Sequence, residues 1–405
     1  MSHKILKHSI PSFCTSNLDV INSLFIFCKN YNLPLLIETT SNQVNQTGGY
    51  SGERPKSFKE KIFKIAKKFN FNKKLLILGG DHLGPLPWKK LNSSVAIKKS
   101  KVLIREYIKA GYKKIHIDTT IKCKDDKILS KKKILDRTFD ILQSIPKLNL
   151  KKTILVLGSE VPPAGGGDNS ITSKNPTTFK SLHEDIKNYR FVVHKKLKIN
   201  IPFYMVVDSG IGYGNKKIYN HNTKIFNSTK FKNRKNFFKY EAHSTDYQSK
   251  LTLKKLINNK FYFLKVGPEV TFSLTKAILQ MCKLEKKFYH ASSDIKKIII
   301  QQVKKNNKHW KDYYKINELD KLLFTSYLDR VRYYWGIKKV KKAKNILFKN
   351  INQLSISQIT RKINFKKKHK MVIKKFNLSN VDSILLFFIF PTLEKYYSAC
   401  GYNLR

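Results

Sequence analysis

Cysteine, arginine and acidic residues are all scarce in this 405-residue chain, and the first two scarcities argue against particular classes of protein. The 5 cysteines lie far apart and form no CxxC pair, which argues against a disulfide framework and against a structural zinc knuckle. We therefore expect reduced thiols in a soluble, cytoplasmic protein. The longest apolar run, Ile384–Phe390, is far shorter than the roughly 20 residues of a membrane span, and the first residues contain no signal-peptide core. The sequence predicts neither export nor membrane insertion.

The net charge of +54 comes almost entirely from lysine. Only 9 of the 81 basic residues are arginine, whereas recognition of bases and phosphates favours the bidentate guanidinium group. The lysines are spread over the whole chain among abundant Asn, Ile, Phe and Tyr, a mixture that codon bias in an AT-rich genome produces. The composition therefore predicts no specific nucleic-acid partner, although nonspecific adherence to RNA stays plausible on charge alone.

Eight short apolar runs rich in β-branched residues, each followed by helical sequence, define the predicted architecture. Their hydrophobicity is continuous rather than alternating, which indicates strands covered on both faces, as in a parallel sheet. Eight βα units favour a (β/α)8 TIM barrel over an open doubly wound sheet, and no GxGxxG motif follows the first run. The predicted strands are Ser9–Cys14, Leu35–Thr39, Leu75–Gly80, Lys114–Asp118, Thr153–Gly158, Pro202–Val207, Phe237–Glu241 and Phe261–Val266.

Helical spacing is clear at Ser57–Phe69 and at Ser94–Ala110, and Gly111 stands where a helix is expected to end. Beyond Lys283 the pattern changes to lysine-rich helical sequence with aromatic clusters. We therefore predict an α/β barrel over residues 1–285 and an all-helical C-terminal extension, packed on the barrel, over residues 286–405.

Polar side chains gather at the predicted strand ends, where function resides in such barrels. The chain has only 27 acidic residues, yet six of the eight strand ends carry one. Carboxylates that converge on one barrel mouth repel each other, so they imply a metal ion, another bound cation or raised pKa values. The residues predicted at this mouth are Glu38, Asp81, His82, Asp118, Glu160, Asp208, Glu241, His243 and Lys265.

His82 and His243 are the predicted ligands of a divalent metal such as zinc, together with one or two carboxylates. Such an ion polarises a sugar carbonyl, with Asp81 as the proton shuttle. The alternative is a hydrogen-bonded polar layer without metal. Lys265 allows a second chemistry, a Schiff base with a ketose, although one lysine at a strand end is a weak signal in so lysine-rich a chain. The carboxylates predicted to act in catalysis are Asp81, Asp118, Glu160 and Glu241.

Several loops have the composition of a phosphate or sugar site. Gly267 is preferred, because it opens a helix after the eighth strand, where free N–H groups suit an anion. The glycines at 48–52 and 165–167 are alternatives that simple turns also explain. Arg330 and Arg332 either clamp phosphate or, as the favoured structural role, pair with Asp329 or a nearby acid. Further residues predicted to contact substrate are Asn42, Gln43, Asn45, Gln46 and Arg54.

Seven long motifs occur in a fixed order along the chain. They are IETTSNQVNQTGGYSGERP, LILGGDHLGP, AGYKKIHIDTT, GSEVPPAGG, YEAHSTDYQ, LKVGPEVTF and LDRVRYYWG. Together they resemble the Z-type subunit family of class II D-tagatose-1,6-bisphosphate aldolase. The likeness extends from about Ile10 to beyond Gly336 and returns at YYSACG near the end.

The resemblance implies a TIM-barrel protein of galactitol and N-acetylgalactosamine catabolism. In that family the Z-type chain supports the activity and stability of a separate catalytic subunit and is non-catalytic alone. A catalytic aldolase subunit is thus the implied partner and a sugar phosphate the implied ligand, with a homo-oligomer left open. Asp81 and His82 resemble the strand-end Asp-His of the catalytic class II aldolases, where Asp shuttles a proton and His binds zinc. The lysine-rich background and the PPAGGGDNS loop depart from the family pattern.

Older naming assigned such proteins as tagatose-6-phosphate kinases, but this sequence has no GxxxxGK[ST] loop and no kinase signature set. We expect an accessory subunit of the aldolase. The alternative is a divalent-metal-dependent aldolase or epimerase acting on ketohexose (bis)phosphates in its own right. A nucleic-acid-associated role is third, because a ring of acids at the barrel mouth repels phosphodiesters. So many ionisable groups in an accessory subunit indicate either a regulatory sugar-phosphate site or a catalytic one.

Overall fold

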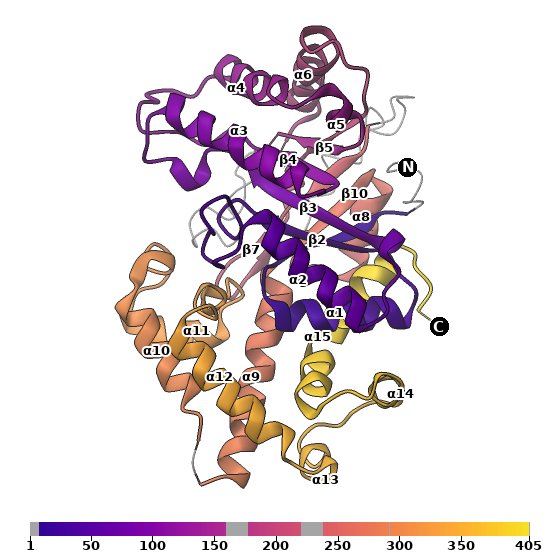
Figure 1. Ribbon diagram of the computed structural model, residues 1–405, viewed down its shortest axis with the longest axis vertical. Helices are drawn as coiled ribbons and strands as arrows, with labels where there is room; N and C mark the ends of the chain where they lie inside the picture. The colour runs from indigo at the N-terminus through magenta and orange to yellow at the C-terminus, as the bar shows by residue number, and fades with distance from the viewer. Residues whose placement is uncertain (1–7, 159–176, 220–237, 291, 405) are drawn as a thin grey trace.

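A computed structural model describes residues 8–158, 177–219, 238–290 and 292–404 (Figure 1). Eight parallel strands close into a barrel in the order β1-β10-β9-β6-β5-β4-β3-β2, which confirms the predicted TIM barrel. The strands are β1 (Ile10–Cys14), β2 (Leu35–Thr40), β3 (Leu76–Leu83), β4 (Lys114–Ile117), β5 (Ile154–Leu157), β6 (Phe203–Val206), β9 (Tyr240–Ala242) and β10 (Phe261–Val266). All eight match a predicted run, although Phe237, the predicted start of the seventh, lies outside the described residues.

One strand is longer than predicted, and the difference affects the site. β3 continues past Gly80, because Thr40 of β2 pairs with Asp81 and Leu83 pairs with Ile117 of β4. Asp81 and His82 therefore lie within the strand, at an irregularity in its register, instead of just beyond its end.

Helices surround the barrel, and more helices gather at one side of it. The barrel helices are α1 (Leu18–Asn30), α2 (Pro55–Lys68), α3 (Ser93–Lys109), α4 (Lys131–Gln143), α5 (Lys147–Lys151), α6 (Phe179–Arg190), α8 (Lys250–Asn258) and α9 (Pro268–Phe288). The C-terminal helices, orange to yellow in Figure 1, are α10 (Ile295–Lys305), α11 (Leu319–Thr325), α12 (Lys338–Asn352), α13 (Ile356–Thr360), α14 (Lys367–Phe376) and α15 (Asn380–Ala399). The predicted boundary at residue 285 falls within α9, so the division into two domains stays a prediction.

The last helix ties the C-terminal part to the barrel. α15 packs against α1, α8 and α9. The Tyr397 hydroxyl donates to the carbonyl of Pro34 at 2.7 Å, just before β2, and the Tyr396 hydroxyl donates to the carbonyl of Thr245 at 2.6 Å, just after β9. Both tyrosines are fully buried, so the C-terminal helix holds a loop at the mouth of the barrel.

Side chains inside the barrel form an apolar layer with a polar layer next to it. Alternate residues of a strand face the same side. Leu36 and Phe263 belong to the interior apolar cluster, and the residues two positions further on are Glu38 and Lys265. The Nζ of Lys114 lies 4.9 Å above the Phe263 ring, at the junction of the two layers.

All five cysteines are free thiols. Within the described residues, no helix is long and apolar enough to cross a membrane.

Candidate functional site

A buried lysine lies at the centre of the polar layer. Lys114 extends from β4, and its Nζ lies 2.5 Å from an oxygen of Glu38 on β2 and 2.5 Å from an oxygen of Glu241 on β9. All three side chains are completely buried. Gly79 makes room for this arrangement, because a Cβ there would lie 2.8 Å from Cγ of Glu38. The lysine therefore bridges two carboxylates from opposite parts of the barrel wall.

A second buried lysine engages the same carboxylates and one more. Lys265 of β10 lies 3.1 Å from Glu38, 3.5 Å from Glu241 and in close contact with Oδ1 of Asp81. The Cys14 thiol lies 3.4 Å from the other oxygen of Asp81. Lys265 therefore shares Glu38 and Glu241 with Lys114 and adds Asp81 to the network, and a Schiff-base role for it stays a prediction.

Three histidines line the mouth beside the lysines, and each has one ring nitrogen fixed by an acceptor. Nδ1 of His82 lies 2.9 Å from Asp118, and Nε2 of His243 lies 2.8 Å from Glu241. Nε2 of His116 lies 2.7 Å from the carbonyl of Gly158. Since each acceptor takes an N–H, the opposite nitrogen of each neutral ring carries the lone pair. Metal-binding histidines are typically held in this way.

His116 also supports a strained backbone. His82 adopts a left-handed conformation with φ of 45°, which is uncommon outside glycine. Its N–H donates to Nδ1 of His116 at 3.1 Å, and its carbonyl accepts the hydroxyl of Ser41 at 2.8 Å. Oδ1 of Asp81 lies 2.8 Å from the same Nδ1, so two acceptor atoms face each other and require a proton or a cation beside them.

Burial and charge act against each other on the pKa values here. Burial disfavours the ionised form of Glu38 and Glu241, but the ammonium groups of Lys114 and, at Glu38, Lys265 outweigh it and lower both pKa values. Burial lowers the pKa of His116 and of His243 to about 4, so both rings are neutral near pH 7.

The site as a whole is negative. The pKa of Asp118 is lowered despite burial, because His82 donates to it. Four acidic side chains (Glu38, Asp81, Asp118 and Glu241) thus lie together with two lysines, so acids outnumber lysines at the mouth. An excess of acids favours a bound cation. One ligand atom from each of Asp81, His82, His116 and His243 lies within 4.8 Å of the others, so this group could hold a metal ion.

The structure brings together most of the mouth residues that the sequence predicts: Glu38, Asp81, His82, Asp118, Glu241, His243 and Lys265. Glu160 and the glycines at 165–167 lie outside the described residues. The sequence analysis missed Lys114 and His116. The signal was present in the segment KIHID: Lys114 and His116 alternate on the inner face of β4, and Asp118 follows in the same register just after the strand ends.

Asp208 lies at the end of β6. Its carboxylate accepts the N–H of Gly210 at 2.8 Å, and its own N–H donates to the hydroxyl of Thr177 at 3.1 Å. These contacts fix the loop after β6, and a substrate contact of Asp208 stays a prediction.

The predicted polar loop after β2 is largely occupied by contacts within the protein. Asn45 accepts the N–H groups of Thr47 and Gly49, and Gln46 donates to the carbonyl of Lys99 at 3.1 Å. Asn42 and Arg54 are exposed, and Arg54 precedes the first residue of α2. Gln43 is the member nearest the ionisable cluster, since its Oε1 lies 3.9 Å from Sγ of Cys14.

The preferred phosphate cradle at Gly267 already holds a carboxylate. Oδ1 of Asp246 accepts the N–H of Gly267 at 2.9 Å and that of Glu269 at 2.8 Å, at the start of α9. A phosphate on these N–H groups would have to displace Asp246. Burial raises the pKa of Asp246 to about 7, with Glu269 nearby adding to the effect, although the two N–H donors oppose it.

An Asp246→Asn variant tests this assignment. Because the folded-state pKa is raised, the folded protein binds the proton more tightly than the unfolded chain, and wild-type stability falls as the pH rises from about 4 to 7. The amide oxygen of Asn still accepts both N–H groups. We expect the variant to be more stable by about 1–3 kcal/mol at pH 8 and equally stable at pH 4, measured by urea unfolding. The exposed Asp136→Asn variant serves as the control; a difference that does not change with pH contradicts the assignment.

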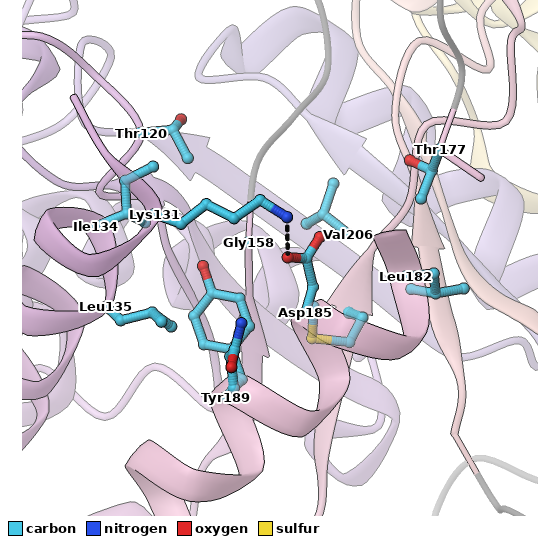
Figure 2. A pocket seen from close by; sticks show the side chains of 12 residues that line it. Thr120, Lys131, Ile134, Leu135, Gly158, Thr177, Leu182, Asp185, Tyr189 and Val206 are labelled. Atoms are coloured by element: carbon cyan, nitrogen blue, oxygen red, sulfur yellow. Dashed lines mark hydrogen bonds and ion pairs between the residues drawn. The ribbon is translucent and has the colours of Figure 1, made fainter. Parts of the chain in front are cut away.

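A separate pocket of about 510 Å³, including the space at its opening, lies between α4 and α6 beside the ends of β5 and β6 (Figure 2). Lys131 and Asp185 form an ion pair of 3.2 Å across it. Gly158 connects it to the barrel mouth, since its carbonyl binds His116. Among the residues that the structure describes, none that the sequence predicts for the site lines this pocket.

Comparison with known proteins shows the family of the chain. The model of a family described as D-tagatose-1,6-bisphosphate aldolase subunit GatZ/KbaZ-like matches residues 2–401. The chain belongs to the GatZ/KbaZ-like family. It is 32% identical over 367 residues to the D-tagatose-1,6-bisphosphate aldolase subunit GatZ of Escherichia coli O6:H1 (strain CFT073), covering 87% of each protein. The GatZ subunit of Escherichia coli SMS-3-5 is 31% identical over the same length and coverage.

A solved structure has the same fold throughout. The chain from Sinorhizobium meliloti 1021, described as a "probable tagatose 6 phosphate kinase", superposes with a TM-score of 0.81 at 25% identity, over 97% of this chain and 100% of that one. The name of kinase is that of the Sinorhizobium meliloti protein and is not transferred to this chain. GatZ/KbaZ-like membership, including the C-terminal helices, therefore covers nearly the whole chain.

Proposed function

We propose that this chain is an accessory subunit that activates and stabilises a separate catalytic D-tagatose-1,6-bisphosphate aldolase subunit in sugar catabolism. The observation that carries the proposal is family membership over residues 2–401, a family described as a subunit of that aldolase. A sugar phosphate is the proposed ligand of the barrel mouth. A cytoplasmic location is part of the proposal and fits five free cysteines.

The contacts of Asp81 support an accessory role over a catalytic one. A proton shuttle has to exchange protons with its substrate, which requires an oxygen that the substrate reaches. Oδ1 of Asp81 contacts Lys265 and His116, and Oδ2 lies 3.4 Å from the Cys14 thiol. The carboxylate is thus held by protein groups on both oxygens.

We also propose that a divalent ion such as zinc binds at the histidine cluster. The donor set fits, because His82 and His243 each direct one N–H to a carboxylate and keep a lone pair on the other nitrogen. The net negative charge of the site favours the same occupant. Such an ion, when bound, polarises a sugar carbonyl. Lys114 and Lys265 contact the surrounding carboxylates.

Mixing this chain with the catalytic subunit of the same organism tests the main proposal. We expect no aldol cleavage by the chain alone, and a several-fold higher rate and longer half-life at elevated temperature for the mixture. Because a protein of charge +54 binds acidic partners nonspecifically, hen lysozyme at equal concentration is the control. Stimulation equal to that by lysozyme, or none, contradicts the accessory role.

A second function, a metal-dependent aldolase or epimerase acting on ketohexose (bis)phosphates, is favoured by the convergence of Asp81 with three histidines. It requires turnover by the isolated chain with added divalent ions and loss of that turnover in Asp81→Asn. Such a result would replace the accessory role.

A further inference from the structure

A second polar cluster, of opposite charge, lies where the C-terminal part meets the loop after β2. The 3-10 turn η6 (Arg330–Tyr333) carries Arg332, whose guanidinium group donates to the Tyr333 hydroxyl at 2.9 Å and lies 4.5 Å from the Tyr333 ring centre. The Tyr50 ring packs edge-on against the Tyr333 ring at 5.1 Å, and His309 stacks on Tyr333 at 4.5 Å. The cluster therefore joins one residue of the barrel loop to three of the C-terminal part.

Arg332 forms no ion pair with an acid of the described residues, although Asp329 is near enough to raise the pKa of its guanidinium group. The sequence favoured an ion pair with Asp329 or a nearby acid, but the two carboxylate oxygens of Asp329 accept the hydroxyls of Thr271 and Thr275 on α9. Among the residues that the structure describes, no carboxylate oxygen lies within 4.0 Å of the Arg332 guanidinium nitrogens. The other acceptors of Arg332 are the main-chain carbonyls of Leu328 and Asp329. All of these acceptors are neutral oxygens, and a guanidinium group forms its strongest hydrogen bonds with anions such as phosphate.

The electrostatic environment of Tyr333 also favours an anion. Burial disfavours its ionised form, yet the nearby guanidinium groups of Arg332 and Arg330 outweigh burial and lower the pKa of Tyr333. The local potential therefore favours negative charge at this point, whereas the centre of the barrel mouth carries an excess of negative charge.

A short path of residues connects the two clusters. Ser51, next to Tyr50 in the chain, donates its hydroxyl to the main-chain carbonyl of Gln43 at 2.6 Å, and Oε1 of Gln43 lies 3.9 Å from Sγ of Cys14. The same thiol lies 3.4 Å from Asp81. The positive cluster around Arg332 thus lies next to the acidic cluster around Asp81. This arrangement suits a ligand that has an anionic group at one end and hydroxyl or carbonyl groups along its body.

We propose that Arg332, Tyr50 and Tyr333 form an anion subsite that binds a phosphate group of the ligand at the barrel mouth. The proposal deepens the sugar-phosphate part of the proposed function and rests on it for the ligand class. In this arrangement the guanidinium fork and the two phenol hydroxyls hold the phosphate, and the sugar body extends toward Gln43 and the histidines. The C-terminal part then contributes directly to ligand binding.

Calorimetric titration at 150 mM salt tests the subsite with three probes: D-fructose 1,6-bisphosphate, inorganic phosphate and D-fructose. We expect Arg332→Gln to weaken the binding of D-fructose 1,6-bisphosphate and of inorganic phosphate by about 10- to 100-fold, since hydrogen bonds to charged groups are worth about 1.5–3 kcal/mol. Binding of D-fructose, which has no phosphate, is expected to stay the same. Arg105→Gln removes an exposed arginine of α3 and is the matched control, with unchanged binding expected.

Three results overturn the subsite: no binding of either phosphorylated probe by the wild-type chain, unchanged binding in Arg332→Gln, or an equal loss in Arg105→Gln. If Arg332→Gln fails to unfold cooperatively, Arg332→Lys and Tyr50→Phe decide, with a loss of about 3- to 10-fold expected for each and unchanged binding overturning the subsite. If the chain stimulates its catalytic partner but binds no phosphate, only the subsite proposal is wrong. If it binds phosphate through Arg332 but does not stimulate the partner, only the accessory role is wrong.

Discussion

Replacing Lys114 with methionine is expected to lower the free energy of unfolding by about 3–5 kcal/mol, because removing one member of a buried ion-pair network leaves uncompensated charge. Glu38 and Glu241 both lie 2.5 Å from the Lys114 ammonium group and are fully buried. Methionine keeps a long apolar side chain, so the lost charge dominates the effect over any new cavity. Urea unfolding followed by circular dichroism measures the change.

The neighbouring residue provides a matched control. Lys113 is exposed on the same segment of the chain, so Lys113→Met is expected to change the free energy of unfolding by less than about 0.5 kcal/mol. Adding Glu241→Gln to Lys114→Met is expected to recover part of the loss, because one of the two stranded charges is then removed. Equal effects of the two lysine variants would show that the network contributes little to stability.

The positions of the eight strands were predictable, apart from the longer end of β3, because parallel strands buried on both faces give continuous apolar runs. Since all eight strands point the same way, their carboxyl ends meet, and the convergence of Glu38, Asp81, Glu241 and His243 follows from the topology alone. Gly84, two residues beyond the GGDH motif, lies very close to the residue after β4. A Cβ at this position would come within 1.8 Å of the Asp118 carbonyl oxygen.

What the sequence did not predict depends on contacts between distant segments. Lys114 is one of many lysines, and only its position on the inner face of β4 distinguishes it from the exposed Lys113. The sequence analysis expected converging acids to imply bound cations or raised pKa values. The structure instead shows two buried lysines that lower the pKa values of Glu38 and Glu241, and the strongly raised carboxyl pKa is that of Asp246, at the start of α9. No pattern of spacing identifies that capping contact.

A His243→Ala variant is expected to lose at least about 100-fold in zinc affinity, and Asp118→Asn about 10- to 100-fold. His243 supplies a ring nitrogen to the proposed site, and its other nitrogen is fixed by Glu241 at 2.8 Å. Asp118 supplies no ligand atom in this set but fixes Nδ1 of His82 at 2.9 Å, so its amide variant leaves the ring free to turn. Competition with a fluorescent chelator measures the affinity, and mass spectrometry of the purified chain measures the bound metal.

His183→Ala removes an exposed histidine of α6 and is expected to bind zinc as the wild type does. For a metal site, we expect zinc to bind His243→Ala more weakly than Asp118→Asn, and both more weakly than His183→Ala. This order distinguishes a metal site from a hydrogen-bonded polar layer. A polar layer predicts no stoichiometric zinc in any of the four proteins, together with a loss of stability in Asp118→Asn, because the His82 N–H then loses a charged acceptor. The zinc measurement therefore decides between a bound metal ion and a hydrogen-bonded polar layer at this site.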